Sequence, residues 1–359
     1  MKKRSIDKIN NHQLSSNFYS SETIFKSTIN NIFVQAWHIL GPYQKFNNNV
    51  SYPLTILDGT ASIPIIVYRG KELNQPTILS NVCTHRGHLV LNDCSQRKSL
   101  RCRYHGRKFT LSGKFVNAPG FTENKQFPSK NDCLPKLRSH VFSNLLFSNI
   151  NYKVGYDLFD VINSICGWYP FDTLIYNNTL SKSYDIRSHW SLYVENYLEG
   201  LHVPFIHSGL SSALDLNLYK TQEHGSAIVQ YGFASRQEEA LSKIEGSPDE
   251  AKTYYGIYIY LFPNIMINIY NWGVSYNYII PVAPNRTIVR YFVFSFNENI
   301  NIDGCDSIST VELEDQDVVI NVQRGVQSPL YKPGILSSKH EQGVIAFRKK
   351  LIESLKKII

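Results

Sequence analysis

The chain has few cysteines for its length, with six in 359 residues. That number is too small for the disulfide framework of a secreted protein, and in a reducing compartment it favours metal or catalytic roles for some of the thiols. Only two of the six have a ligand-like spacing. The other four, which we interpret as buried or incidental thiols, are Cys94, Cys133, Cys166 and Cys305.

Long apolar runs are also lacking. The most hydrophobic region, residues 254–278, is interrupted by Pro263 and by asparagines, and its partial alternation of polar and apolar residues suits a sheet rather than a membrane helix. Residues 1–34 contain no apolar stretch of signal-peptide length, so we expect a cytoplasmic protein with no membrane contact. No nucleotide-binding glycine motif is present either, which argues against a dinucleotide cofactor in this chain.

Two different patterns of secondary structure divide the chain. Residues 50–150 contain short strands between turns, such as 63–68, 77–82 and 141–147, and no sustained helical periodicity. From about residue 155 the pattern is mixed. It predicts a helix over 190–202, antiparallel strands over 254–296, a helix over 311–326, and a last helix that begins at a capping box of Ser338 and Glu341.

Two short Cys and His pairs carry the strongest chemical signal. Cys83-x-His85 and Cys102-x-x-His105 are separated by sixteen residues. Each pair supplies one thiolate and one imidazole, so two loops can hold a 2Fe-2S cluster with Cys on one iron and His on the other. A structural zinc site is the alternative, but zinc fingers group their cysteines apart from their histidines. Gly87 and Gly106 fit tight turns in the two loops.

A second metal site is indicated by His202 and His207. On one regular helix, side chains five residues apart point about 140° away from each other, so the pair could not share an ion. Pro204 lies between them and should break the helix just after His202, letting the imidazoles converge. Two histidines and one carboxylate form the facial triad of non-haem Fe(II) oxygenases. Acidic candidates cluster at residues 312–317, where a solvated helix start is the simpler alternative.

Both loops together resemble the Rieske motif of bacterial ring-hydroxylating oxygenases. The resemblance rests on Cys83-Thr-His85-Arg86-Gly87 and Cys102-Arg-Tyr104-His105-Gly106. Respiratory Rieske proteins add a cysteine to each loop, where this chain has His88 and Tyr104, and many oxygenases have Trp where it has Arg107. Farther on, Glu314-Asp315, seven residues and Gln323-Arg324-Gly325 resemble the C-terminal signature of oxygenase α subunits.

The resemblance implies an α+β fold in two domains after an N-terminal segment of residues 1–34. Residues 35–150 would form an all-β Rieske 2Fe-2S domain. Residues 151–359 would form a helix-grip, START-like catalytic domain with a curved antiparallel sheet and a mononuclear iron. The resemblance also places the carboxylate ligand on Asp315, with Asp317 as the second candidate, beside His202 and His207.

An electron path follows from the same resemblance. NAD(P)H would be used indirectly, through a separate reductase or ferredoxin, and electrons would pass from the 2Fe-2S cluster to Fe(II), which activates O2. In the family an acidic residue at the place of Glu199 bridges the mononuclear site of one subunit to the Rieske histidine of its neighbour in a trimer. We therefore expect a homotrimer in which Glu199 has a catalytic role.

The substrate stays open at this point. The implied reaction is hydroxylation, dihydroxylation or oxidative demethylation of a small organic molecule, either an aromatic ring or a quaternary amine. Tyrosines of the sheet could form an aromatic cage for a cation, although tyrosine is also common in sheets for packing reasons alone. The alternative function is a Rieske electron-transfer protein whose second domain binds a ligand without catalysis.

A net charge of +8 raises the question of nucleic-acid binding, and the distribution of that charge decides it. Residues 86–108 contain seven basic side chains and one acid, Asp93, around the proposed cluster loops. A solvated basic surface explains most of them. The functional interpretation is that they attract an acidic electron-donor protein, and we expect no nucleic-acid partner. The seven are Arg86, Arg97, Lys98, Arg101, Arg103, Arg107 and Lys108.

Overall fold

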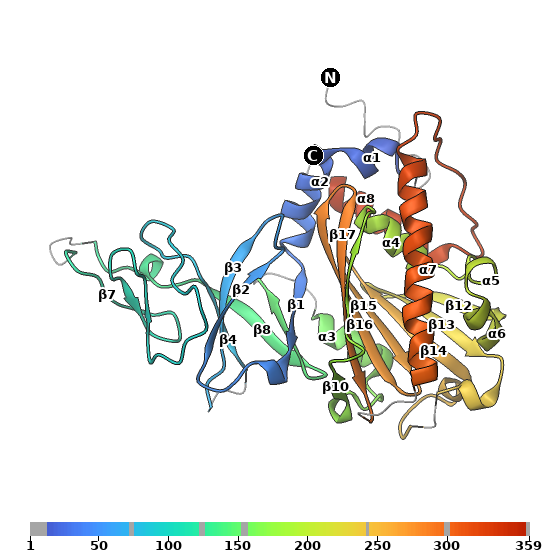
Figure 1. Cartoon of the computed structure of the whole chain (residues 1–359), viewed down its shortest axis with the longest axis horizontal. Helices are drawn as coiled ribbons and strands as arrows, with labels where there is room; N and C mark the ends of the chain where they lie inside the picture. The colour runs from blue at the N-terminus through green and yellow to red at the C-terminus, as the bar shows by residue number, and fades with distance from the viewer. Residues whose placement is uncertain are drawn as a thin grey trace. The chain divides into compact units, whose positions relative to one another are not determined.

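The computed structural model describes residues 13–356, except 72–74, 122–125, 152–156, 242–243 and 298–301; side chains are not described for 302–308. The chain forms two compact units, shown in Figure 1. The first unit is Val34–Gly155. The second combines Met1–Phe33 with Tyr156–Ile359, so the described N-terminal helices belong with the second unit.

The first unit is built from antiparallel strands. Its larger sheet has the order β1-β9-β8-β4-β3-β2, and a small sheet has the order β5-β6-β7. Its core joins apolar side chains such as Ile66, Leu79 and Phe109 to the thiols of Cys83 and Cys102. The strands are β1 (Trp37–Pro42), β2 (Ser51–Ile56), β3 (Ile63–Tyr68), β4 (Thr77–Ser80), β5 (Leu100–Arg101), β6 (Lys108–Phe109), β7 (Phe115–Asn117), β8 (Lys136–Phe142) and β9 (Leu145–Asn149).

One predicted strand, 141–147, is wrong, because the chain reverses in its middle. Ser143 and Asn144 have φ values of 49° and 58°, and β8 and β9 pair on either side of them. Two central residues with positive φ make a turn whose twist matches a hairpin. The sequence pattern did not predict this turn, because the rest of the segment is apolar.

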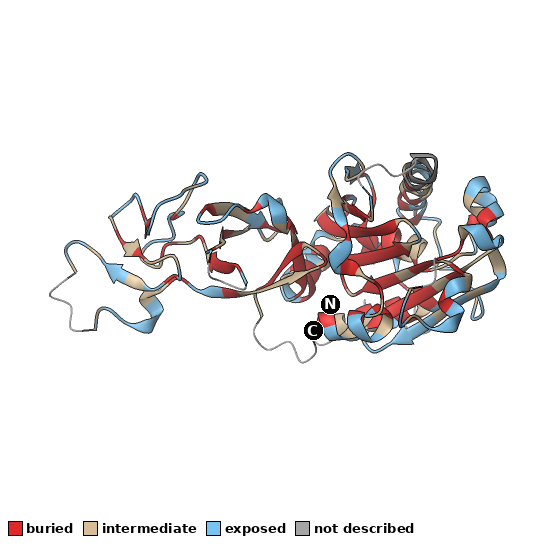
Figure 2. Cartoon of the chain, turned by 90° about the horizontal axis from the view of Figure 1, so that it is seen from below, coloured by how far each residue is buried: buried red, intermediate tan, exposed pale blue. Residues whose placement is uncertain are grey.

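The second unit is built on a large antiparallel sheet with the order β10-β17-β16-β15-β14-β13-β12, and β11 also pairs with β17. The prediction of antiparallel strands over 254–296 is confirmed, with breaks at Pro263, at 271–272 and at 284–285. The strands are β10 (Ile175–Asn177), β11 (Ser183–Ile186), β12 (Leu214–His224), β13 (Ala227–Ala234), β14 (Tyr254–Leu261), β15 (Ile265–Tyr270), β16 (Gly273–Ala283) and β17 (Arg286–Ser295). Figure 2 shows buried residues concentrated on this sheet.

Helices accompany this sheet, and Figure 1 shows the long helix α7 running along it. Ser16 at the start of α1 donates its hydroxyl to the carbonyl of Val326 at the end of α7, which ties the N-terminal segment to this unit. The helices are α1 (Ser16–Ser20), α2 (Glu22–Thr28), α3 (Leu158–Cys166), α4 (Trp190–Tyr197), α5 (Val203–Ile206), α6 (Ser208–Ala213), α7 (Ile302–Val326) and α8 (Gln342–Lys356).

Several predicted helix limits were wrong. α7 ends at Val326 as predicted but begins at Ile302, nine residues earlier than expected. α8 begins at Gln342, and the capping hydroxyl belongs to Ser337 rather than Ser338: Glu341 accepts from the Ser337 backbone N–H, and Ser337 accepts from the N–H of His340. A one-residue shift of this kind is invisible in a Ser-Ser sequence.

α4 and α8 are held together by buried contacts. Arg348 of α8 donates two hydrogen bonds to the Glu195 carboxylate of α4, at 3.0 and 2.6 Å. A Cβ atom on Gly343 would lie 2.3 Å from the Leu198 carbonyl oxygen, so only glycine allows this approach. Within the part of the chain that the structure describes, no helix is long and apolar enough to cross a membrane.

Candidate metal centres and pocket

The two cluster loops of the first unit have nearly the same backbone design. In the first, the Cys83 N–H donates to the His88 carbonyl and the Gly87 N–H donates to the Cys83 carbonyl. In the second, the Cys102 N–H donates to the Arg107 carbonyl and the Gly106 N–H donates to that of Cys102. The two glycines have φ values of 74° and 73°, a conformation that glycine adopts without strain. The loops leave β4 and β5 and present matching Cys and His side chains.

Between them, the loops place the four predicted ligands together. The thiols of Cys83 and Cys102 are buried side by side, and burial and then the Cys102 thiol raise the pKa of Cys83. The imidazoles of His85 and His105 lie outward, with ring centroids 4.7 Å apart. Two adjacent buried thiols under two imidazoles match the donor set of a Rieske cluster. They do not match a 2Fe-2S cluster with four cysteine ligands.

Arg107 was predicted as part of a basic surface, and this prediction is wrong. Its side chain is 4% exposed, pairs with Asp132 at 3.0 Å and donates to the Thr84 hydroxyl at 2.9 Å. Phe115, Phe121 and Phe127 surround the guanidinium, with ring centroids 5.2 to 5.5 Å away. Because Thr84 lies between the ligands of the first loop, Arg107 ties that loop to the second.

In the second unit, the helix that carries the predicted iron ligands ends early. α4 stops at Tyr197, where the prediction continued it to His202. Glu199 explains the turn that follows, since its carboxylate accepts from the backbone N–H groups of Leu201 and His202. Pro204 lies in the first turn of α5. It therefore begins a short helix and does not break a long one, which suits its missing N–H.

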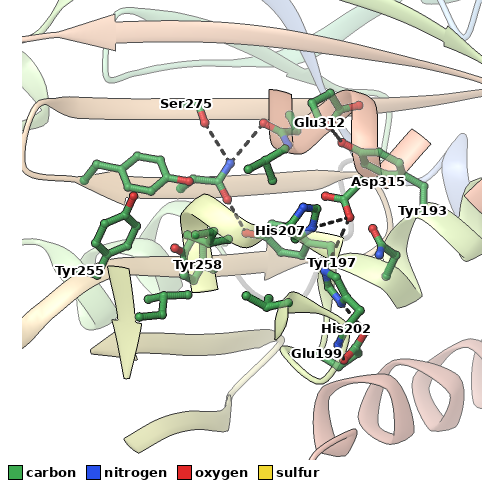
Figure 3. A pocket seen from close by; sticks show the side chains of 18 of the residues that line it. Tyr193, Tyr197, Glu199, His202, His207, Tyr255, Tyr258, Ser275, Glu312 and Asp315 are labelled. Carbon is green, nitrogen blue, oxygen red and sulfur yellow. Dashed lines mark hydrogen bonds and ion pairs between the residues drawn. The ribbon is translucent and has the colours of Figure 1, made fainter. Parts of the chain in front are cut away.

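This path brings His202, His207 and Asp315 together, as Figure 3 shows. One ligand atom from each lies within 4.8 Å of the others. His207 Nε2 is 3.0 Å and His202 Nε2 is 3.6 Å from Asp315 Oδ1. Two imidazole nitrogens and one carboxylate oxygen on one side of a site are the donors of a 2-His-1-carboxylate Fe(II) centre, so the residues present fit that metal.

The opposite nitrogen of each imidazole is held by a second carboxylate. His202 Nδ1 lies 2.5 Å from Glu199, and His207 Nδ1 lies 2.7 Å from Glu314. Such partners set the tautomer and leave Nε2 free to bind a metal. Burial acts to lower the pKa of His207, but the bonds to Asp315 and Glu314 raise it overall.

Glu314 was missed by the sequence interpretation as a partner of His207. The two residues are 107 positions apart, and the acidic run around 314 gives no sign of which member faces the histidine. Asp317, the second candidate for ligation, is exposed and lies outside the three-residue group. The placement of these side chains therefore favours Asp315.

A pocket adjoins the three-residue group. It is bounded by α4, α5, α7 and the sheet, and tyrosines dominate its wall. Asn268 on β15 accepts from the Tyr197 hydroxyl and donates to Ser275 and Asn277 on β16. The other aromatic residues of the wall are Tyr193, Tyr219, Tyr255, Tyr258, Tyr270, Trp272 and Tyr291.

An all-β unit with paired Cys and His loops, joined to a helix-and-sheet unit with a 2-His-1-carboxylate group beside a pocket, defines a Rieske-type iron-dependent oxygenase. The chain belongs to the family of ring-hydroxylating oxygenase α subunits. The family model for the catalytic domain, Ring hydroxylating alpha subunit, matches residues 176–357, and the Rieske [2Fe-2S] domain model matches residues 36–128.

Individual relatives agree with this family. The chain is 25% identical to the carnitine monooxygenase oxygenase subunit of Acinetobacter baumannii, covering 91% of this chain and 89% of the relative. It is 23% identical to the chloroplastic choline monooxygenase of Amaranthus tricolor, covering 92% and 75%.

Solved structures show the same fold. A quaternary ammonium Rieske monooxygenase that oxidises carnitine superposes with a TM-score of 0.73 at 22% identity, over 95% of each chain. Naphthalene 1,2-dioxygenase from Rhodococcus sp. superposes with a TM-score of 0.69 at 14% identity, over 98% of this chain and 96% of the other.

Proposed function

We propose that this oxygenase hydroxylates a quaternary ammonium compound. Oxidation of a carbon away from the nitrogen would give an alcohol or aldehyde, and oxidation of a carbon attached to the nitrogen would release an amine, with formaldehyde where that carbon is a methyl group. The observation that carries the proposal is the tyrosine-lined pocket beside His202, His207 and Asp315. The relatives of this chain include enzymes named for carnitine and for choline, and each of these two compounds contains a trimethylammonium group.

Aromatic rings in this pocket form a corner suited to a cation. Tyr270 is stacked on Trp272, with ring centroids 5.1 Å apart and planes 15° apart. Tyr255 and Tyr258 stand at 79° and 76° to Tyr270, at 6.3 and 5.9 Å. Ring faces that meet at such angles attract a methylated ammonium, which offers no hydrogen bonds but spreads its charge over its methyl groups.

The predicted metal ligands and their carboxylate partners have distinct tasks. Cys83, His85, Cys102 and His105 would hold the 2Fe-2S cluster, and His202, His207 and Asp315 would hold Fe(II). When bound, these groups deliver electrons to O2 and activate it. Glu199 and Glu314 keep the ligand imidazoles turned toward the metal, as their short contacts with Nδ1 require.

The electron supply is also part of the proposal. Because no dinucleotide motif is found in this chain, NAD(P)H would be oxidised by a separate reductase or ferredoxin system. The exposed basic residues of the first unit, which include Arg86, Arg101 and Arg103, suit an acidic donor. We propose a homotrimer in which Glu199 bridges to the Rieske histidine of the next subunit, and a location in the cytoplasm.

Oxygen uptake by the holoenzyme with a reductase and NAD(P)H tests this function. Choline, carnitine, glycine betaine and an aromatic hydrocarbon would be compared, with product analysis for aldehyde, amine and formaldehyde. We expect uptake coupled to product formation with at least one methylammonium compound and with no hydrocarbon. Coupled turnover of the hydrocarbon alone would show that the substrate is an aromatic ring and that the proposal is wrong.

A further inference from the structure

A buried carboxylate forms part of the pocket wall without belonging to the three-residue metal group. Glu312 lies one helical turn before Asp315 on α7 and is 3% exposed. Its Oε2 accepts from the hydroxyls of Tyr193, at 2.8 Å, and Tyr291, and its Oε1 accepts from Gln316 at 2.8 Å. Burial raises the pKa of Glu312 to about 7, while the three hydrogen bonds act to lower it. A positive charge in the pocket would favour its ionised form.

No basic side chain balances this carboxylate. Among the described residues that line the pocket, none is Lys or Arg, and three are acids: Glu199, Glu312 and Asp315. Bound Fe(II) brings two positive charges, and Asp315 together with the carboxylates that contact the ligand imidazoles, Glu199 and Glu314, already supplies three negative ones. Glu312 is then the pocket acid that has no counter-charge, and uncompensated buried charge is costly.

The opposite side of the pocket carries no charge, because it combines the aromatic corner of Tyr255, Tyr258, Tyr270 and Trp272 with a few neutral polar groups. Figure 3 shows Glu312 beside the metal group, with Ser275 and Tyr255 on the other side. Asn268 uses its amide N–H groups on Ser275 and Asn277, so the hydroxyl of Ser275 and the amide of Asn277 are the pocket-lining donors there. Such donors suit a hydroxyl or carbonyl oxygen. A carboxylate would find no cation on either side.

We propose that Glu312 supplies the counter-charge for the substrate. The enzyme is then selective for monocations, that is, for methylated amines whose remaining part is neutral, as in an amino alcohol. It discriminates against zwitterions, which also carry a carboxylate. This inference rests on the proposed function. It separates the choline type of substrate from the carnitine and betaine types. Glu312 acts across the pocket on the charge of the substrate, so it is a specificity-determining residue and takes no part in the oxidation itself.

The test compares ligands of nearly equal shape and different charge on the iron-loaded holoenzyme. Choline is the monocation, 3,3-dimethyl-1-butanol its neutral carbon isostere, and glycine betaine and carnitine are the zwitterions. KM or inhibition constants are measured by coupled oxygen uptake. We expect the wild type to bind choline at least about tenfold more tightly than its isostere and than either zwitterion, as one unbalanced buried charge predicts.

Glu312→Gln should raise the KM for choline about tenfold while leaving the inhibition constant of the neutral isostere unchanged. Glu312→Asp keeps the charge and should keep the preference. Glu250→Gln is the matched control, because Glu250 accepts from the Tyr254 hydroxyl outside the pocket wall. Iron content and melting temperature show whether each variant is folded and loaded.

Three results are decisive. Zwitterions bound as tightly as choline by the wild type would overturn the inference, and this comparison needs no variant to fold. An unchanged preference in a loaded Glu312→Gln enzyme would overturn it as well. If no methylammonium compound supports coupled uptake, the proposed function fails, and that outcome is distinct from coupled uptake without charge selection.

Discussion

Each histidine of the proposed iron site lies between two carboxylates, and the roles of these carboxylates differ. Asp315 lies on the Nε2 side of both rings, while Glu199 and Glu314 each hold one Nδ1. When both imidazoles are neutral, each Nδ1–H donates a hydrogen bond to its carboxylate partner, so both Nε2 lone pairs point to one place. The asymmetry favours Asp315 as the metal ligand and the other two acids as groups that orient the imidazoles.

The assignment of Asp315 can be tested against Asp317, two positions along the same helix. Asp315→Ala should remove the mononuclear iron and lower total iron by about one third, since a Rieske cluster holds the other two atoms. The exposed Asp317 serves as the control, and Asp317→Ala should keep all the iron. Iron analysis together with the visible spectrum of the cluster measures both; loss of iron from the Asp317 variant instead would reverse the assignment.

Glu199 has two contacts with the site, through the backbone turn and through the His202 ring. Glu199→Gln keeps the size of the side chain and one hydrogen-bonding oxygen, so both metal sites should still load. We expect coupled turnover to be abolished, because the neutral amide cannot bridge two imidazoles as a carboxylate does. Rapid-reaction spectra should show a cluster that is reduced normally but not reoxidised with substrate and O2; full activity in this variant would show that Glu199 has no role in electron transfer.

At the residue scale, local spacing was informative and distant pairing was not. The four cluster ligands could be predicted because each loop contributes a pair within three residues. Glu314 and Glu312 could not, because their partners His207 and Tyr193 are 107 and 119 residues away. Nor could the sequence show that Arg107 turns inward, since its partner Asp132 lies in a later loop.

Among the elements, α4 matters most for the site, because its C-terminal end leads directly into the metal-ligand segment. Strand positions were predicted well where proline and glycine punctuate the apolar runs, as between β14 and β17. The end of α4 was predicted too late, because the turn after Tyr197 depends on the Glu199 side chain capping the chain, and the prediction gave no weight to Gly200, three residues after the helix end.

The ion pair between Glu195 and Arg348 fixes α4 to α8, with side chains only 12% and 9% exposed. Removing one partner would leave a buried charge, so Glu195→Ala should lower the free energy of unfolding by about 3–5 kcal/mol. The pair between Arg286 and Asp185 has the same chemistry but is half exposed. Asp185→Ala should therefore leave the urea midpoint nearly unchanged, and equal losses in the two variants would contradict this account of burial.

His189 caps the start of α4 and makes its stability depend on pH. The ring is fully buried against Phe18 and Tyr19, and desolvation lowers the pKa of His189 to about 3. Because the unfolded state has a higher pKa, about 6.5, this group stabilises the fold above that pH and loses its contribution as the pH falls toward 3.

The loss from His189 should reach about 2 kcal/mol at pH 5. His189→Asn keeps a capping side chain but cannot take up a proton. Urea unfolding at pH 7 and pH 5 should show the stability advantage of the wild type over this variant shrinking by that amount. A constant difference would mean that the ring is protonated in the folded protein.

At the scale of the whole molecule, the two units have separate sequence signals, and each could be predicted by itself. The all-β character of the first unit follows from its short strands, and the second follows from its long strands and amphipathic helices. Residues 1–34 were predicted as a separate segment, yet residues 13–33, the described part that groups with the second unit, pack there through contacts such as Ser16 with Val326. Contacts over 310 residues of sequence leave no local pattern.

The proposed trimer predicts that the two metal centres of one chain need not serve each other. Oligomers would be assembled from two inactive chains, one carrying His105→Ala and the other Asp315→Ala, each with its own affinity tag. If electrons pass between subunits, a Rieske centre of the second chain can serve the intact iron site of the first, so doubly tagged hybrids should recover turnover.

A hybrid of wild type with Asp315→Ala is the control, and its activity shows that the tags and the mixing are harmless. Hybrids that hold all the expected iron but stay inactive would show that electrons move within one chain, and the bridging role of Glu199 would then lie inside the subunit.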